Sequence, residues 1–110
     1  MLDQVRINVA AEYSTHPLGR ERSVWPFGGE RFREDFLEPR LRGGEAVVVD
    51  LRGVRGLAPS FLEEAFGGLI DAGFTYDDIA RLLTIVTDDT ARERQIWRYI
   101  RVAAGLPLSE

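Results

Sequence analysis

A run of β-branched residues in the middle of the chain constrains the fold most. Ala46 to Leu51 reads AVVVDL and lacks the polar–apolar alternation of a strand with one face in water. A continuous apolar run is typical of a strand buried on both faces, in a sheet with helices on both sides. Ser60 to Asp71 follows with apolar residues at helical spacing. The sequence therefore predicts a buried strand that leads into a helix.

Three more segments have the composition of strands. Val5 to Ala11 alternates polar and apolar residues, which predicts a strand at or near an edge of the sheet. Ser23 to Phe27 is a short candidate, although Pro26 removes a ladder donor. Leu82 to Thr87 (LLTIVT) predicts the last strand.

Helical spacing alternates with these strands. Glu30 to Glu38 has one apolar face, and Pro39 disfavours helix at Glu38 before Gly43-Gly44 ends the segment. Asp77 to Ala80 predicts a short helical turn. A last helix, capped by Asp89 or Thr90, is expected to carry Ile96, Trp97, Ile100 and Ala103. The alternation predicts an α/β fold with a mixed, mostly parallel sheet of about four strands flanked by helices.

Composition limits the chemistry. The chain has 110 residues, a formal charge of -4, no cysteine and one histidine, and all 14 of its basic residues are arginine. This length predicts one domain over 1–110. Without cysteine or lysine there is no thiol nucleophile, Cys/His zinc cluster, phosphate-loop lysine or Schiff-base amine. We expect no metal and no cofactor.

Charge and hydropathy limit the partners. Net acidity with arginines spread along the chain predicts no nucleic-acid partner. No window approaches the roughly 18 apolar residues of a membrane span, so we expect no membrane contact and a cytoplasmic protein.

The segment around the central strand resembles a known family. Asp50, Leu51, Gly53 and Val54 match the Asp-Leu-x-Gly-Val step of STAS domains, the fold of anti-sigma factor antagonists. The string SFLEEAFG at 60–67, with GERFRE at 29–34 and TDD at 87–89, is similar to the small bacterial STAS-like family of unassigned function. The resemblance implies a STAS-like fold that binds a protein partner, with a GHKL-type ATPase or an anti-sigma-like kinase as candidates.

The resemblance also locates a regulatory position. Phosphorylatable STAS domains carry their target serine in an Asp-Ser-Ser-Gly-like turn, and the matching positions here are 58–61. Pro59 therefore replaces the usual phosphoacceptor, which leaves Ser60 as the candidate phosphorylation site. The residues alone favour a structural role for Ser60, because Ser60-x-x-Glu63 has the spacing of a capping box, and replacing Ser60 with alanine should then cost about 1 kcal/mol.

The partner surface is expected around the start of this helix. Gly67 and Gly68 should each cost the helix about 1 kcal/mol relative to alanine, which implies either close packing on a strand or a smooth face for a partner. Glu64 is either an exposed first-turn carboxylate or part of that face. The predicted partner-binding residues are Arg55, Leu57, Pro59, Ser60, Glu64, Gly67 and Gly68.

Of two further functions, a ligand sensor stays an alternative and a hydrolase is excluded. A sensor for a small ligand or nucleotide would use the carboxyl ends of the strands, at Asp50 and Thr87. The residues also fit a structural role for Asp50, as an acceptor for loop amides. A hydrolase built on Ser60 lacks a base, because His16 lies in an early loop, so no catalytic residue is assigned. The leading hypothesis is a non-enzymatic module that binds another protein. The sequence does not determine its oligomeric state.

Overall fold

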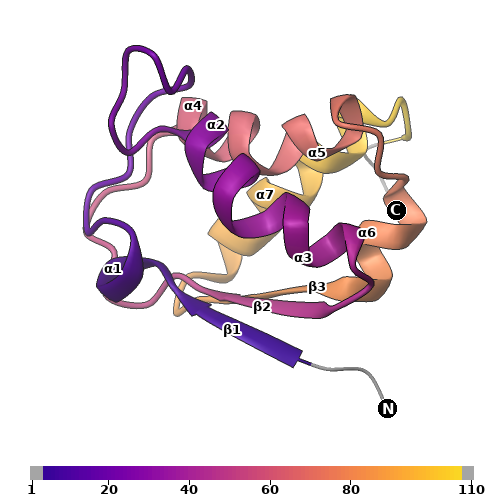
Figure 1. Ribbon diagram of the computed structural model, residues 1–110, viewed down its shortest axis with the longest axis horizontal. Coiled ribbons are helices and arrows are strands. Elements are labelled where there is room, and N and C mark those ends of the chain that lie inside the picture. Colours follow the sequence, from indigo (N-terminus) through magenta and orange to yellow (C-terminus); the bar gives the residue numbers. More distant parts are fainter. Residues whose placement is uncertain (1–3, 108–110) are drawn as a thin grey trace.

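The computed structural model describes residues 4–107. It contains three strands, seven α-helical segments and two π-helical turns, labelled η (Figure 1). In chain order they are β1 (Gln4–Asn8), α1 (Val9–Glu12), α2 (Gly29–Phe32), η1 (Arg33–Leu37), α3 (Glu38–Arg42), β2 (Ala46–Asp50), α4 (Pro59–Leu62), η2 (Glu63–Gly67), α5 (Gly68–Asp71), α6 (Tyr76–Leu82), β3 (Leu83–Val86) and α7 (Thr90–Ala103).

The described strands form one sheet in the order β1-β2-β3, and both pairings are parallel. The α/β class and the edge position of β1 are confirmed. The expectation of about four strands in a mixed sheet is not, since residues 4–107 contain three strands and no antiparallel pair. The first strand ends at Asn8, whose side chain accepts from the Ala11 amide and so begins α1 where the sequence predicted more strand.

Helices cover only one face of this sheet (Figure 1). Ile7, Val47 and Val49 point to that face and pack into the core with Phe32, Phe61, Phe66, Leu69, Ile96 and Ile100. On the opposite face Arg6 and Thr84 are exposed, and Val48 lies between them in register. The apolar run correctly predicted that β2 is buried. The expected helices on both sides are wrong for the described residues, because helices lie on one face only, although Val48 on the other face is just 5% exposed.

Two longer helices are each interrupted by a π turn. Residues 29–42 and 59–71 are continuous, and we refer to them as helix 29–42 and helix 59–71. In the first, the Glu38 amide bonds to the Arg33 carbonyl five residues earlier. Pro39 follows directly, without an amide to donate and with a ring that would clash with the preceding turn of a regular helix. The widened turn relieves this conflict, so the helix continues past Glu38 where the sequence predicted an end.

The start of helix 59–71 differs from the predicted capping box. Its N-cap is Ala58, which has extended backbone and makes no side-chain cap bond, and Pro59 occupies the first helical turn. Ser60 is thus already inside the helix, and Glu63 instead pairs with Arg20. Pro59 explains the shift, since its fixed φ suits the first helical position and the amide that it lacks needs no partner there.

This difference changes the expected effect of replacing Ser60. Ser60→Ala should lower the free energy of unfolding by less than about 0.5 kcal/mol, because no cap is lost. Asp89 is a true N-cap of α7, accepting from the amides of Ala91 and Arg92, so Asp89→Ala should cost about 1 kcal/mol. Urea unfolding of both variants measures the contrast, and an equal loss in both would show that Ser60 does cap its helix.

Candidate functional site

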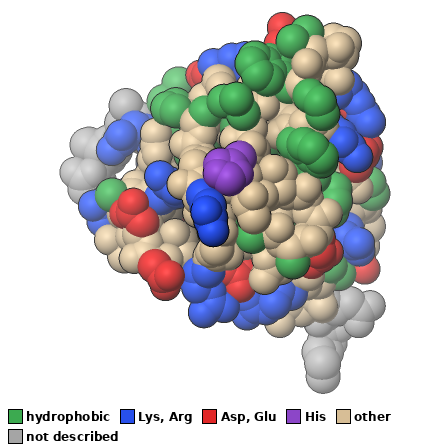
Figure 2. All heavy atoms as spheres, turned by 90° about the vertical axis from the view of Figure 1, so that its left-hand side faces the viewer, with side chains coloured by type: hydrophobic (Ala, Val, Ile, Leu, Met, Phe, Trp, Pro, Cys, Tyr) green, Lys and Arg blue, Asp and Glu red, His purple; other side chains and the backbone are tan. Residues whose placement is uncertain are grey.

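Apolar side chains are exposed on the loop that precedes helix 29–42. Leu18, Val24, Trp25 and Phe27 are 48%, 63%, 37% and 43% exposed. Residues 17–28, which we call the apolar loop, form turns, so the strand predicted at Ser23 to Phe27 is wrong. The loop projects from the molecule at the upper left of Figure 1, and hydrophobic side chains gather beside the single histidine in Figure 2. An exposed apolar patch on a small protein commonly marks an interaction surface.

Backbone hydrogen bonds hold the apolar loop closed. The Leu18 amide donates to the Phe27 carbonyl at 3.1 Å, and the Gly29 amide donates to the Gly19 carbonyl at 2.8 Å. Gly19 has a φ of +92°, and the Trp25 ring packs so closely on it that a Cβ would lie 2.1 Å from the ring. The loop is therefore ordered by its own backbone and by Trp25, as in compact Ω-loops.

Side chains from the rest of the molecule anchor the same loop. The Tyr13 hydroxyl donates to the Gly28 carbonyl at 2.7 Å, and burial raises the pKa of Tyr13 to about 12. Arg22 pairs with Glu34 and Asp35 on helix 29–42. Arg31 donates to the Pro26 carbonyl at 2.6 Å. The exposed apolar side chains thus belong to a loop whose backbone is already ordered, which lowers the entropy cost of binding a partner.

A groove of about 360 Å³ separates the start of the apolar loop from the β2–α4 connection. We call it the loop groove. The two walls are tied together where the Arg55 amide donates to the Thr15 carbonyl at 2.7 Å. It is lined by His16, Pro17, Leu18, Gly56, Leu57 and Ala58.

The predicted partner-binding residues fall into two groups. Leu57 lines the loop groove, Arg55 and Pro59 flank its wall in the sequence, and Ser60 is partly buried in the first turn of α4. Glu64, Gly67 and Gly68 lie farther along helix 59–71 and face other helices. The exposed apolar loop was missed by sequence reasoning, although its signal was present: the aromatic and apolar residues at 24–27 are interrupted by Pro26, which a strand disfavours.

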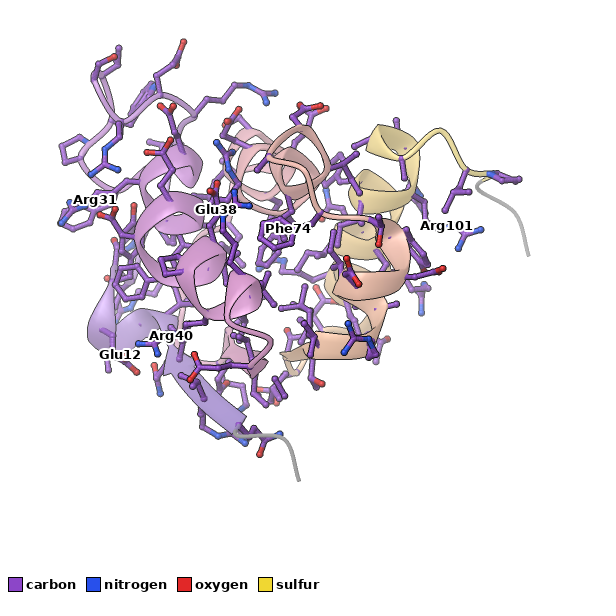
Figure 3. The ribbon with its side chains drawn as sticks, turned by 45° about the vertical axis from the view of Figure 1, so that its right-hand side comes forward. Glu12, Arg31, Glu38, Arg40, Phe74 and Arg101 are labelled. Atoms are coloured by element: carbon purple, nitrogen blue, oxygen red, sulfur yellow. The ribbon has the colours of Figure 1, made fainter. Side chains whose placement is uncertain are left out.

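Arg33 ties helix 29–42 to helix 59–71 beside Glu64. The Gly68 amide bonds to the Glu63 carbonyl through the π turn, which leaves the Glu64 carbonyl free of the helix ladder. Arg33 Nη1 donates to this carbonyl at 2.6 Å and to Glu64 Oε2 at 2.8 Å, while Arg33 Nε donates to Glu38 Oε2 at 2.9 Å. Figure 3 shows Glu38 on the side of α3 that faces helix 59–71. Burial lowers the pKa of Arg33, but these carboxylates more than offset it and raise that pKa.

The two glycines provide room for this packing. A Cβ at Gly68 would lie 2.2 Å from Arg33 Nη1, and a Cβ at Gly67 would lie 3.4 Å from the Tyr99 carbonyl of α7. Both glycines are buried and, together with Glu64, line a pocket of about 230 Å³, and partner binding at these residues stays a prediction. Close packing explains them, but against a helix and an arginine side chain where the sequence suggested a strand.

Asp50 and Thr87, the residues of the alternative ligand site, make contacts inside the chain. Asp50 accepts from the Arg52 amide at 3.0 Å, from Arg52 Nη2 at 2.8 Å and from Arg6 Nη1 at 3.1 Å. Hydrogen bonds from Arg52 lower the pKa of Asp50 to about 2. Thr87 Oγ1 accepts from the Asp89 amide at 3.1 Å. The loop amide predicted for Asp50 is present, together with two guanidinium groups.

These contacts predict an acid-sensitive contribution to stability. The folded-state pKa of Asp50 lies below its ordinary value of 3.8, so the stabilisation is present above pH 4 and is lost as pH falls toward 2. We expect about 1 kcal/mol, because Arg6 and Arg52 are half in water and screened. Urea unfolding of the wild type and Asp50→Asn at pH 7 and pH 3 measures it. A stability difference between the two proteins that does not shrink at pH 3 would contradict this assignment.

The described part of the chain contains neither a group of metal ligands nor a membrane-spanning helix. Within residues 4–107, no three Asp, Glu or His side chains are grouped closely enough to hold a metal ion. None of the helices in this range is both long and apolar enough to cross a membrane.

The comparison with family models identifies the chain as a STAS-like domain. The family model described as a STAS-like domain of unknown function (DUF4325) matches residues 28–91, more than half of the chain. The chain belongs to this family, which confirms the resemblance seen in the sequence. No curated protein and no solved structure matches the chain significantly.

Proposed function

We propose that the chain is a non-enzymatic, cytoplasmic protein-interaction module that resembles anti-sigma factor antagonists. Its partner surface consists of the apolar loop, the loop groove and the start of α4. The observation that carries this proposal is the exposure of Leu18, Val24, Trp25 and Phe27 on a loop whose backbone is fixed. A GHKL-type ATPase or an anti-sigma-like kinase is the partner class suggested by the family resemblance.

The surface differs in part from the one expected from the sequence. Gly67, Gly68 and Glu64 are engaged with α7 and Arg33, so we leave them out of it. The apolar loop takes their place. Asp50 supports the interaction role over the small-ligand alternative, because both of its carboxylate oxygens already accept hydrogen bonds from arginine.

Binding to a defined partner tests the proposal. The tagged chain is used to capture proteins from its native host, and a captured GHKL-type ATPase or kinase is then purified and titrated by calorimetry. Val24→Asp should weaken binding at least about tenfold, because it places a charge on the most exposed apolar residue of the loop. Val102→Asp is the matched control, since Val102 is 54% exposed but lies on α7.

Two results would overturn the proposal. One is the absence of direct binding to any purified GHKL-type ATPase or kinase of the host. The other is an equal effect of Val24→Asp and Val102→Asp, since the binding would then not depend on the apolar loop. Ser60→Ala should leave the affinity almost unchanged, because we expect binding without a phosphorylation switch.

A further inference from the structure

One wall of the loop groove is a non-helical segment, residues 55–58, in which most backbone polar groups are unused. Residues 55–58 belong to no helix or strand. The Arg55 amide and the Ala58 carbonyl have partners, in Thr15 and Leu62. Within residues 4–107, no hydrogen bond involves the amides of Gly56, Leu57 and Ala58 or the carbonyls of Gly56 and Leu57. The segment therefore offers free backbone donors and acceptors with which a second, extended chain can pair.

The opposite wall suits an apolar side chain. Pro17 and Leu18 line it, and Leu18 is 48% exposed. Gly56 leaves the groove open, since a Cβ at this position would have no neighbouring atom within 4 Å. Because side chains of an extended chain alternate between its two faces, a chain paired with 56–58 can place every second side chain toward this wall.

The charge next to the groove is positive. Arg55 is exposed and pairs with no carboxylate in the described part of the chain. Nearby arginines of the apolar loop differ, since Arg20 pairs with Glu63 and Arg22 with Glu34 and Asp35. A carboxylate on a bound chain would complete the charge pairing that Arg55 lacks.

We propose that the loop groove binds an extended segment of a partner protein by pairing with the backbone of 56–58. One aliphatic or aromatic side chain of that segment enters the groove, and a neighbouring Asp or Glu pairs with Arg55. This inference rests on the proposed interaction function and specifies how the partner is recognised.

A displayed library of random peptides tests the proposal on the full chain. Selection should enrich peptides in which an apolar residue is adjacent to, or one residue away from, an Asp or Glu. A synthetic copy of the most enriched peptide is then titrated by fluorescence anisotropy. Hydrogen exchange at the Leu57 or Ala58 amide should slow at least about tenfold when this peptide is saturating, because the amide becomes hydrogen-bonded.

Variants separate groove binding from general adhesion. Gly56→Phe adds a bulky ring to a residue that lines the groove and should weaken peptide binding at least about tenfold. Gly43→Phe is the control, because Gly43 is an exposed residue at the end of helix 29–42 and a Cβ there has only ordinary contacts at 3.5 Å. Arg55→Glu should weaken binding more than Arg55→Gln does, since it repels the carboxylate of the peptide. Thermal unfolding of each variant verifies that it is folded.

The outcomes distinguish this inference from the proposed function. The inference is wrong if no peptide is enriched, or if the enriched peptide binds Gly56→Phe as tightly as wild type. It is also wrong if that peptide lacks acidic residues and its affinity does not change with Arg55→Glu. In each case the proposed function would still hold if the host kinase binds the chain and Val24→Asp weakens that binding. The partner surface would then be the apolar loop alone. Peptide binding without any kinase binding would instead support an extended-segment site and overturn the proposed partner.

Discussion

Replacing Arg33 with methionine is expected to lower the free energy of unfolding by about 3–5 kcal/mol, the largest effect that we expect for a charged residue among those that the structure describes. The side chain of Arg33 is 10% exposed, and its guanidinium bonds to Glu38, to Glu64 and to the Glu64 carbonyl released by the π turn. Methionine fills similar space but leaves that carbonyl and the Glu64 carboxylate without this donor. Urea unfolding at pH 7 measures the loss.

Two comparison proteins make this prediction specific. Arg40→Met removes an arginine of the same helix, but Arg40 is half exposed and its distance to Glu45 is 3.8 Å, so the loss should stay below about 0.5 kcal/mol. The double variant Arg33→Met/Glu64→Gln should be more stable than Arg33→Met alone, because it removes the unpaired charge that Arg33→Met leaves on the partly buried Glu64. A loss in Arg33→Met no larger than that in Arg40→Met would show that Arg33 does not join the two helices.

Replacing Gly29 with alanine is expected to destabilise the protein by about 2–3 kcal/mol despite the better helix propensity of alanine. A Cβ at Gly29 would lie 2.6 Å from the Phe61 carbonyl and 2.8 Å from the Ala65 amide nitrogen. Both are backbone atoms of helix 59–71, so relief requires the two helices to separate. Chemical unfolding of the variant provides the measurement.

Gly43→Ala is the matched control for Gly29→Ala. Its Cβ would meet the nearest backbone oxygens at 3.5 Å, an ordinary contact, so the change in stability should stay within about 0.5 kcal/mol. Equal effects of the two substitutions would mean that helix 29–42 and helix 59–71 approach less closely than the structure shows.

Local patterns predicted the elements that depend on local chemistry. The run of valines indicated β2, and Asp89 was one of two residues expected to cap α7. Predictions of helix ends were wrong where a neighbouring part of the chain offsets the preference of a single residue. Pro39 normally disfavours a helix, but the π turn before it absorbs the conflict, and the bond geometry that allows this has no signature in the residues themselves. Likewise, the helix begins at Pro59 with Ala58 as its N-cap, earlier than the Ser60 capping pattern predicted.

The candidate site was predicted in part. Its β2–α4 wall was expected because residues 50–54 and 60–67 resemble STAS domains, a resemblance that implies a partner surface at this place. The apolar loop was not expected, because its exposure depends on bonds between residues far apart in the sequence, such as that from Tyr13 to Gly28. Nothing in the sequence indicated the ion pairs near this site, in which Arg20 pairs with Glu63 and Arg33 pairs with Glu64.

The two π turns have a consequence for comparing this chain with its relatives. Each wide turn holds one residue more than a regular turn would, so it is equivalent to a single-residue insertion inside a helix. Alignments that forbid gaps within helices would misplace every residue on one side of 33–37 or 63–67. A relative that lacks the extra residue in 63–67 should also lack the free carbonyl that Arg33 binds, and selection should then no longer retain the arginine. The extra residue and the arginine are therefore expected to be gained and lost together during evolution of the family.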